Sequence, residues 1–366
     1  MFAGVACHTL ALLPRLEPDH WIWLALIVTV GAVVGSFFNV VIYRWPLGRS
    51  IVRPPSNCPS CGKYIHARHN IPVLGWLMLR GRCYFCNTPI SPRYPLIETL
   101  SALSLGLLGW LEPLGNGVNL PVDPELIDGS YEIADLFGIL AFHGALLSGL
   151  LIAAGIDFDR HRVPRGLAIA LILIALGVTW YRPTFLPVIA FETLPAQLQE
   201  QRGAIGVISS FYGAIAGAML GALAAPATSL GRSGKEGSWS VLLMTTCVGA
   251  FLGWQAVGTI TAVCAIAFAL VVVLRHGITP MKNITFLMLL WLGTLVWLAA
   301  WSWFQARIMT ALASPADLPV GTVQLHLVKL LIAQGLIVTA MSTIAYLLRG
   351  PALTVSKSTA PTNQTS

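Results

Sequence analysis

Long stretches of apolar residues recur along the chain, separated by short polar or glycine- and proline-rich breaks. The first stretch runs from Trp21 to Tyr43 and carries no charge, which is enough for a helix to cross about 30 Å of hydrocarbon. A second runs from Pro95 to Trp110, and others lie at 136–156, 166–181, 204–225, 239–256, 258–274, 284–304 and 327–348. The pattern predicts an all-α polytopic membrane protein with about nine transmembrane helices.

The composition agrees with this fold class. Of the 366 residues 56% are hydrophobic and only 10% are charged, and the mean hydropathy is +0.75. A chain of this kind cannot bury its apolar surface in one soluble core. The pI of about 9.2 does not require a nucleic acid partner, because basic loops on the cytoplasmic face of a membrane protein are sufficient to explain it.

The distribution of basic residues predicts the orientation in the membrane. If the N-terminus is outside and nine spans alternate, 17 of the 22 Lys and Arg residues lie inside. The five outside are Arg15, Arg182, Arg202, Arg307 and Lys329. The reversed orientation would place the basic segment 44–94 outside, against the positive-inside rule. We therefore expect a short outside N-terminus (1–20), an acidic outside loop (111–133) and a disordered cytoplasmic tail (349–366).

The segment between the first two predicted helices, 44–94, contains two Cys-x-x-Cys pairs, Cys58 with Cys61 and Cys83 with Cys86. Pairs about twenty residues apart are typical of a four-thiolate zinc site, because each pair forms a tight knuckle and the linker folds back to complete a tetrahedron. Gly62 follows the first pair, and a glycine can adopt the positive φ that such a knuckle commonly needs. Two disulfides or four unligated thiols are the alternatives. We expect one structural zinc ion in a small cytoplasmic zinc-knuckle insert.

Two carboxylates, Asp157 and Asp159, stand at the predicted cytoplasmic end of the third span. A carboxylate at the C-terminus of a helix opposes the helix dipole, so another interaction should favour it. One interpretation is ion pairing with the arginines nearby in sequence, which are Arg160, Arg162 and Arg165. The other is acid–base chemistry at the membrane interface, where ionisable groups are often functional. The spacing alone does not separate the two interpretations.

Several segments, taken in order, resemble the bifunctional type IV prepilin peptidase/N-methyltransferase family. They are Gly35-Ser-Phe-Phe-Asn-Val-Val-Ile-Tyr-Arg-Trp-Pro46, the double Cys-x-x-Cys insert with Asn70-Ile-Pro-Val73, Arg93-Tyr-Pro-Leu-Ile-Glu98 and Ile156-Asp-Phe-Asp159. The resemblance covers residues from about 30 to 165. A weaker similarity continues through Gly234-Lys-Glu-Gly237 and Val248-Gly-Ala-Phe-Leu-Gly-Trp-Gln255, and beyond Arg275 the match is loose.

The resemblance implies an aspartic protease of the bacterial inner membrane that removes the basic leader of prepilins or pseudopilins at the cytoplasmic face. The same protein would then methylate the new N-terminus with S-adenosylmethionine and serve a type IV pilus or type II secretion machinery. The implied roles are metal binding on the methyltransferase side for the cysteine insert and first catalytic aspartate for Asp157. Residues 95–304 would form the membrane-embedded peptidase domain, and 305–348 an added loop and helix.

The chain departs from the family pattern at the second catalytic aspartate. The segment after Gly237 reads Ser-Trp-Ser-Val-Leu-Leu-Met-Thr-Thr-Cys and contains no aspartate, so the expected position holds Val241 or Leu242. Aspartic proteolysis uses two carboxylates that share a proton, so one alone performs half of the task. Asp159 and Glu236 are possible substitutes, although Asp159 would point away from Asp157 if the helix continued past it.

Three functions therefore compete. The first is a prepilin-processing enzyme, the second an inactive pseudoenzyme that serves as a scaffold for pilus or secretion assembly, and the third a transporter with a zinc-stabilised domain. The transporter is disfavoured because the later spans hold almost no ionisable residues. No Gly-x-Gly-x-x-Gly motif locates a cofactor site, and we interpret His66, His69 and Glu98 near the knuckles as surface or structural residues.

Overall fold

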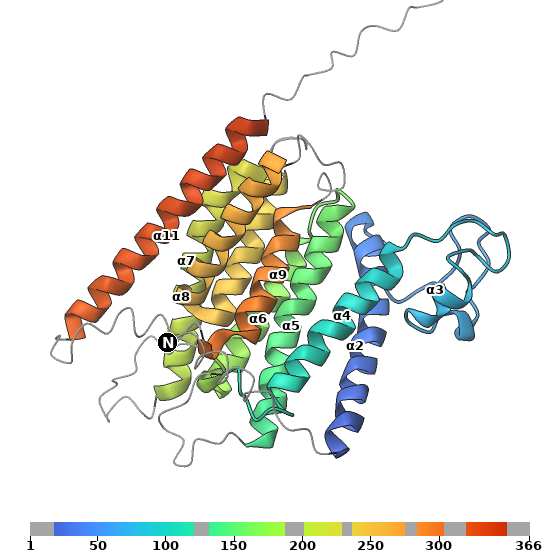
Figure 1. Cartoon of the computed structure of the whole chain (residues 1–366), viewed down its shortest axis with the longest axis horizontal. Coiled ribbons are helices and arrows are strands. Elements are labelled where there is room, and N and C mark those ends of the chain that lie inside the picture. The colour runs from blue at the N-terminus through green and yellow to red at the C-terminus, as the bar shows by residue number, and fades with distance from the viewer. Residues whose placement is uncertain are drawn as a thin grey trace, which may run out of the picture.

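The computed structural model of the chain describes residues 18–120, 132–186, 201–228, 236–274, 284–303 and 320–349. These residues form a bundle of long helices with a small irregular insert at one side (Figure 1). The long helices are α2 (Pro18–Arg44), α4 (Arg93–Leu111), α5 (Ile133–Phe158), α6 (Arg165–Tyr181), α7 (Arg202–Thr228), α8 (Glu236–Leu274), α9 (Phe286–Ala299) and α11 (Val320–Arg349). Shorter helical turns are η1 (Trp45–Leu47), η2 (Ala67–His69), α3 (Leu74–Met78) and η3 (Pro183–Phe185). Most of the predicted N-terminal segment, the centre of the acidic loop and the predicted disordered tail after Arg349 lie outside the described residues.

The predicted all-α class is confirmed over the described ranges, where the only β pairing consists of two isolated bridges inside the insert. Six helices of this part, α2, α4, α5, α7, α8 and α11, are long and apolar enough to cross a membrane, and α6 and α9 are apolar but shorter. The chain is therefore a multi-pass membrane protein. Each predicted stretch coincides with one of these helices, but 239–256 and 258–274 both fall within α8.

Gly253 divides α8 into two parts. Its φ of 77° and ψ of 171° are non-helical, and a positive φ of this size favours glycine. The first part packs antiparallel to α7, with Leu242 against Gly221 and Gly249 against Gly213. The two backbones lie so close that a Cβ atom on Gly213 would be only 2.0 Å from the Gly249 carbonyl oxygen. Close helix packing here depends on the absence of side chains.

The second part of α8 packs antiparallel to α9. The Cys264 thiol donates to the Leu289 carbonyl at 3.2 Å, and the rings of Phe268 and Phe286 meet edge to face. At the end of the bundle that holds the α4–α5 connection, α7 begins and α9 finishes. Because α7 and α9 run in opposite directions, the chain reverses direction at Gly253. The sequence predicted this break near residue 257, and the structure places it at the glycine.

The last described helix, α11, packs along the outside of α7 and α8 (Figure 1). Its Gln334 side chain donates to the Thr259 hydroxyl at 2.9 Å and faces Gly258 of α8. A buried polar contact of this kind fixes the register of α11, in which most of the other side chains described, those of residues 330–348, are exposed or half-buried.

A buried hydrogen bond joins α4 to α5 at the end of the bundle opposite the insert. Glu112 Oε1 and His143 Nδ1 lie 2.7 Å apart, and both side chains are fully buried. In the turn after α4, Asn119 donates to the Leu298 carbonyl at 2.8 Å. These contacts connect α4, α5 and α9 where the chain leaves the membrane-crossing segments.

The insert, residues 45–92, connects the end of α2 to the start of α4 and projects to the side of these two helices (Figure 1). The two helices pack closely, because Gly31 and Gly35 of α2 face the backbone of α4. The insert is therefore attached to two closely packed helices, α2 and α4, and it lies at the same end of the bundle as the C-terminus of α5.

Candidate metal centre and aspartate site

The four cysteines of the insert form one cluster. The Sγ atoms of Cys58, Cys61, Cys83 and Cys86 all lie within 4.8 Å of one another, and all four are free thiols. Pairing as two disulfides is thereby excluded in this structure. Four sulfurs at such separations fit a tetrahedral zinc ion, which prefers thiolate ligands and is closed to substrate when all four positions are protein sulfurs.

The two pairs have the same backbone design. In the first knuckle the Cys58 amide donates to the Lys63 carbonyl, and the Gly62 amide donates to the Cys58 carbonyl. In the second knuckle the Cys83 amide donates to the Thr88 carbonyl, and the Asn87 amide donates to the Cys83 carbonyl. Gly62 and Asn87 occupy equivalent places with φ of 70° and 58°. Glycine and asparagine tolerate this conformation best, so the residue after each pair closes the turn.

The thiols differ in acidity. The Thr88 hydroxyl and amide hydrogen-bond to Cys86 and lower its pKa to about 6, and the Cys61 amide lowers the pKa of Cys58. The Lys63 amide lowers the pKa of Cys61, but burial and the neighbouring thiols outweigh it and raise this pKa to about 11. At neutral pH the metal-free cluster thus offers the Cys86 thiolate, while Cys61 holds a proton that a metal ion must displace.

Aromatic and basic side chains surround the second knuckle. His66 and His69 lie against the Tyr84 ring, and Lys63 and Arg68 lie over the rings of Phe85 and Tyr84. Neither histidine belongs to the four-thiol cluster. Both histidines thus take part in ring packing within the insert, and their interpretation as surface or structural residues stays a prediction.

Glu98 connects the insert to the membrane helices. It is buried in the second turn of α4, and its Oε2 accepts a hydrogen bond of 2.6 Å from the Val73 amide, at the start of α3. The side chains of Ser36 and Asn39 on α2 also hydrogen-bond to this carboxylate. The hydrogen bond from the Val73 amide to Glu98 accompanies a positive φ of 61° at Val73, which is unfavourable for a β-branched residue.

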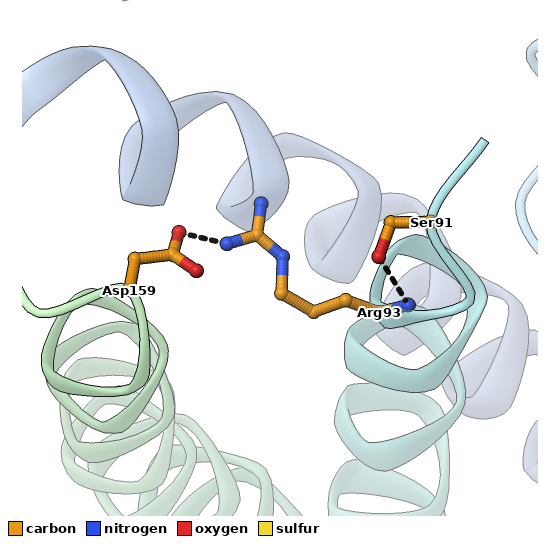
Figure 2. A network of polar contacts seen from close by, with 3 residues as sticks. All are labelled: Ser91, Arg93 and Asp159. Carbon is orange, nitrogen blue, oxygen red and sulfur yellow. Dashed lines mark hydrogen bonds and ion pairs between the residues drawn. The ribbon is translucent and has the colours of Figure 1, made fainter. Parts of the chain in front are cut away.

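Asp157 and Asp159 occupy different environments. Asp157 lies in the last turn of α5 and is 7% exposed. The helix ends at Phe158, and Asp159 forms an ion pair with Arg93 of α4 (Figure 2). The arginine that pairs with Asp159 is thus remote in sequence, not one of the three nearby arginines. Although the helix has ended, as a catalytic use of Asp159 requires, this carboxylate is already engaged.

The two residues at which the sequence analysis expects the second aspartate are apolar and lie within α8. Val241 is 2% exposed within the first part of α8, and the neighbouring Leu242 packs against Gly221 of α7. Glu236 is the first residue of α8, and its side chain lies outside the described residues. Neither apolar residue can take part in proton transfer.

Sequence reasoning missed Arg93 as a partner of Asp159 and Val73 as a partner of Glu98. Arg93 and Glu98 both belong to the segment Arg93-Tyr-Pro-Leu-Ile-Glu98, at the start of the second predicted span. Their common signal was a charged residue at the membrane end of a predicted span, where a partner is expected.

Comparisons with known proteins show which family the chain is similar to. The family model for the Bacterial Peptidase A24 N-terminal domain matches residues 29–111, which include the insert and most of α2 and α4. A prepilin leader peptidase/N-methyltransferase of Klebsiella pneumoniae is 32% identical over 264 residues, covering 68% of this chain and 94% of that protein. No solved structure matches the chain.

Two further relatives carry the same name but match a shorter part. The protein of Myxococcus xanthus is 40% identical over 148 residues, 38% of this chain and 43% of its own length. The protein of Dickeya chrysanthemi is 42% identical over 113 residues, 25% of this chain and 40% of its own length. The alignment with the Klebsiella protein covers more than nine tenths of that relative, which is long enough to define the family.

Proposed function

The chain belongs to the prepilin leader peptidase/N-methyltransferase family, and we propose that it binds prepilins or pseudopilins at the cytoplasmic face of the bacterial inner membrane. The observation that supports this proposal is the meeting of two family elements at one end of the bundle. The insert and α4 come from the matched N-terminal region, and Arg93 of α4 is ion-paired to Asp159, two residues after the buried Asp157.

In the proposed peptidase half, Asp157 is the first catalytic aspartate. It would take a proton from the attacking water, and its burial at the end of α5 keeps it near the membrane surface where a leader would be cut. The second carboxylate, which would donate a proton to the peptide carbonyl, would be missing, because the expected position holds Val241 or Leu242. We therefore propose that this chain alone cleaves a leader very poorly.

In the proposed methyltransferase half, the four cysteines hold a structural zinc ion that fixes the fold of the insert. The donor set fits zinc because zinc binds four thiolate sulfurs in a tetrahedron. The site would be structural, because four protein sulfurs leave no coordination position for substrate. S-adenosylmethionine is the proposed methyl donor. Among the described residues nothing identifies its site, so no step is assigned to particular side chains.

The proposed topology has nine crossings, with the N-terminus outside and the C-terminus inside. Support comes from the reversal of the chain at Gly253. The part of α8 before this residue runs antiparallel to α7, and the part after it runs antiparallel to α9, so the two parts count as two crossings. With α6 and α9 as short crossings, α11 then ends on the same side as the insert. The basic residues of the insert would face the cytoplasm, as the positive-inside rule requires.

A direct test is to reconstitute the purified protein with a prepilin in proteoliposomes and to follow two products separately. Methylation is tested on a prepilin that has already lost its leader, so that it does not depend on cleavage. We expect methyl transfer from S-adenosylmethionine to the prepilin that has already lost its leader, and almost no removal of the leader from the intact prepilin. Absence of methylation and of prepilin binding would reject the proposed function.

A second candidate function is favoured by the apolar residue at position 241. A protein that binds prepilin without processing it would act as a scaffold for a type IV pilus or type II secretion machinery. Prepilin binding without methylation in the same experiment would select this alternative.

A further inference from the structure

We propose that α3 is an interfacial helix that docks on the bilayer surface beside α4, placing Leu74, Leu77 and Met78 among the headgroups of anionic phospholipids. This docking goes beyond the proposed function and does not depend on peptidase or methyltransferase activity. It concerns the surface of the insert that the zinc cluster does not use.

The depth of α3 relative to the membrane helices carries the inference. The Val73 amide, at the N-terminus of α3, donates to Glu98 in the second turn of α4. Five residues of helix separate Arg93 from Glu98, a distance of about 7–8 Å along the helix axis. Since α4 is a candidate membrane span beginning at Arg93, α3 lies at the level where such a helix enters the headgroup region.

The face of α3 that points away from the insert is apolar. Leu74, Leu77 and Met78 are 55%, 55% and 61% exposed, and their spacing of three and four residues places them on one side of the helix. The opposite side packs inward, because Gly75 is buried against the His69 carbonyl and Trp76 donates its indole N–H to Ile90. Three large apolar side chains on one exposed turn fit an interface with lipid.

Charge identifies the kind of lipid. Segment 44–94 contains eight Lys and Arg residues and neither Asp nor Glu. Arg68 precedes α3, and Arg80 and Arg82 follow it directly, all with exposed side chains. Basic side chains flanking an apolar helical face bind anionic membrane surfaces, where the arginines pair with phosphates while the apolar groups enter the interface.

The short length of α3 is not an obstacle to docking. An isolated five-residue helix would bind lipid weakly, but this one is connected at both ends of the insert to membrane-crossing helices. The connection makes docking intramolecular, so that a small gain per contact is sufficient. Figure 1 shows the insert beside the ends of α2 and α4, which leaves α3 next to the space that lipid would occupy.

The test uses the full chain with a photo-crosslinking amino acid at position 77, reconstituted in nanodiscs of phosphatidylcholine alone or with phosphatidylglycerol. Mass spectrometry of the irradiated protein identifies what position 77 contacts. Lipid adducts should form, and phosphatidylglycerol should raise their yield. Reversing two charges with R80E and R82E together should lower the yield on anionic discs by about tenfold.

The control is K63E, which reverses a charge of the insert that does not flank α3 in the sequence and lies over the Phe85 ring. It should leave most of the adduct yield intact. Limited proteolysis of each variant checks that the insert remains folded, and the milder pair R80Q and R82Q replaces the reversal if it does not. Absence of lipid adducts on both discs, or adducts to protein in native membranes in place of lipid, would overturn the proposal. An equal yield of lipid adducts on discs with and without phosphatidylglycerol would overturn the assignment to anionic lipid.

Discussion

Arg93 and Asp159 form an ion pair that joins the start of α4 to the end of α5, although 66 residues separate them in the chain (Figure 2). The two side chains are only 14% and 23% exposed, so the pair is partly shielded from water. It also gives Asp159 a structural partner two residues from the buried Asp157. The contact therefore bears on both the stability of this end of the bundle and the identity of the second carboxylate.

Removing one member of this pair should destabilise the protein. R93Q leaves the Asp159 carboxylate without its charged partner, and we expect a loss of about 1–2 kcal/mol, reduced from the value for fully buried pairs because water still reaches both groups. R93Q combined with D159N should cost less than the sum of the two single changes. Unfolding of the four proteins in one detergent measures the coupling, and strictly additive losses would contradict a direct interaction.

A zinc ligand variant should lose metal without losing membrane insertion. C83S removes one sulfur of the cluster, so stoichiometric zinc should disappear and residues 57–94 should become sensitive to protease. The membrane helices satisfy their own backbone groups and should remain inserted. C247S makes the same chemical change at a buried thiol of α8 and should keep its zinc. Elemental analysis that finds no metal in the parent protein would reject the zinc site.

Zinc retention should depend on pH. In the metal-free cluster Cys86 has a pKa of about 6, mainly because of its hydrogen bonds with Thr88. Since this pKa is depressed from its ordinary value, the stabilisation it provides is present at alkaline pH and is lost as the pH falls through about 6. Zinc affinity should fall over the same range, because protons then compete for the thiolate. Chelator competition at several pH values measures this, and a pH-independent affinity would contradict thiolate ligation.

Reporter fusions should place Asn70 and Asn116 in opposite compartments. Asn70 lies in the insert, and Asn116 is an exposed residue of the turn after α4, so one crossing separates them. We expect Asn70 in the cytoplasm, because the basic insert resists translocation. The same compartment for both would show that α4 does not span the membrane.

The sequence predicted those parts of the fold that depend on local composition. Apolar stretches located every described long helix, because hydropathy requires no knowledge of the partner helix. The reversal within α8 was placed four residues too late, since Trp254, Gln255 and Ala256 are compatible with either end of a helix while Gly253 alone adopts the positive φ. The sequence also predicted the cysteine cluster, because the two cysteines of each Cys-x-x-Cys pair are close neighbours in the chain and form one knuckle.

Long-range pairing could not be predicted in the same way. Asp159 is surrounded in sequence by Arg160, Arg162 and Arg165, yet it pairs with Arg93 because the ends of α4 and α5 come together in the bundle. Likewise the partner of Glu98 is a backbone amide in the insert, and a backbone group carries no sequence signal. Such contacts depend on helix packing, which a single sequence leaves open.

The peptidase should be almost inactive in this chain and should regain activity when an aspartate is restored. Loss of one member of a catalytic set lowers turnover by about four powers of ten, so trace cleavage is the expected starting point. V241D places a carboxylate at one of the two positions that the family pattern allows, on the buried face of α8. Leader removal from a reconstituted prepilin should rise with V241D and fall again when D157N is added. L242D tests the other allowed position, whose backbone lies beside Gly221 of α7, and only one of the two variants should restore cleavage.

The substitutes considered from the sequence make this experiment decisive. If Asp159 supplied the second carboxylate, D159N would abolish cleavage while R93Q, which frees Asp159, would increase it. If the ion pair is purely structural, both variants lower stability alike and neither changes the trace rate at a temperature where the protein is folded. Efficient cleavage by the parent protein that requires Asp157 together with Asp159 or Glu236 would show that the site is intact. Efficient cleavage that survives D157N would reject aspartic chemistry, because the only aspartate assigned to the reaction would then be dispensable.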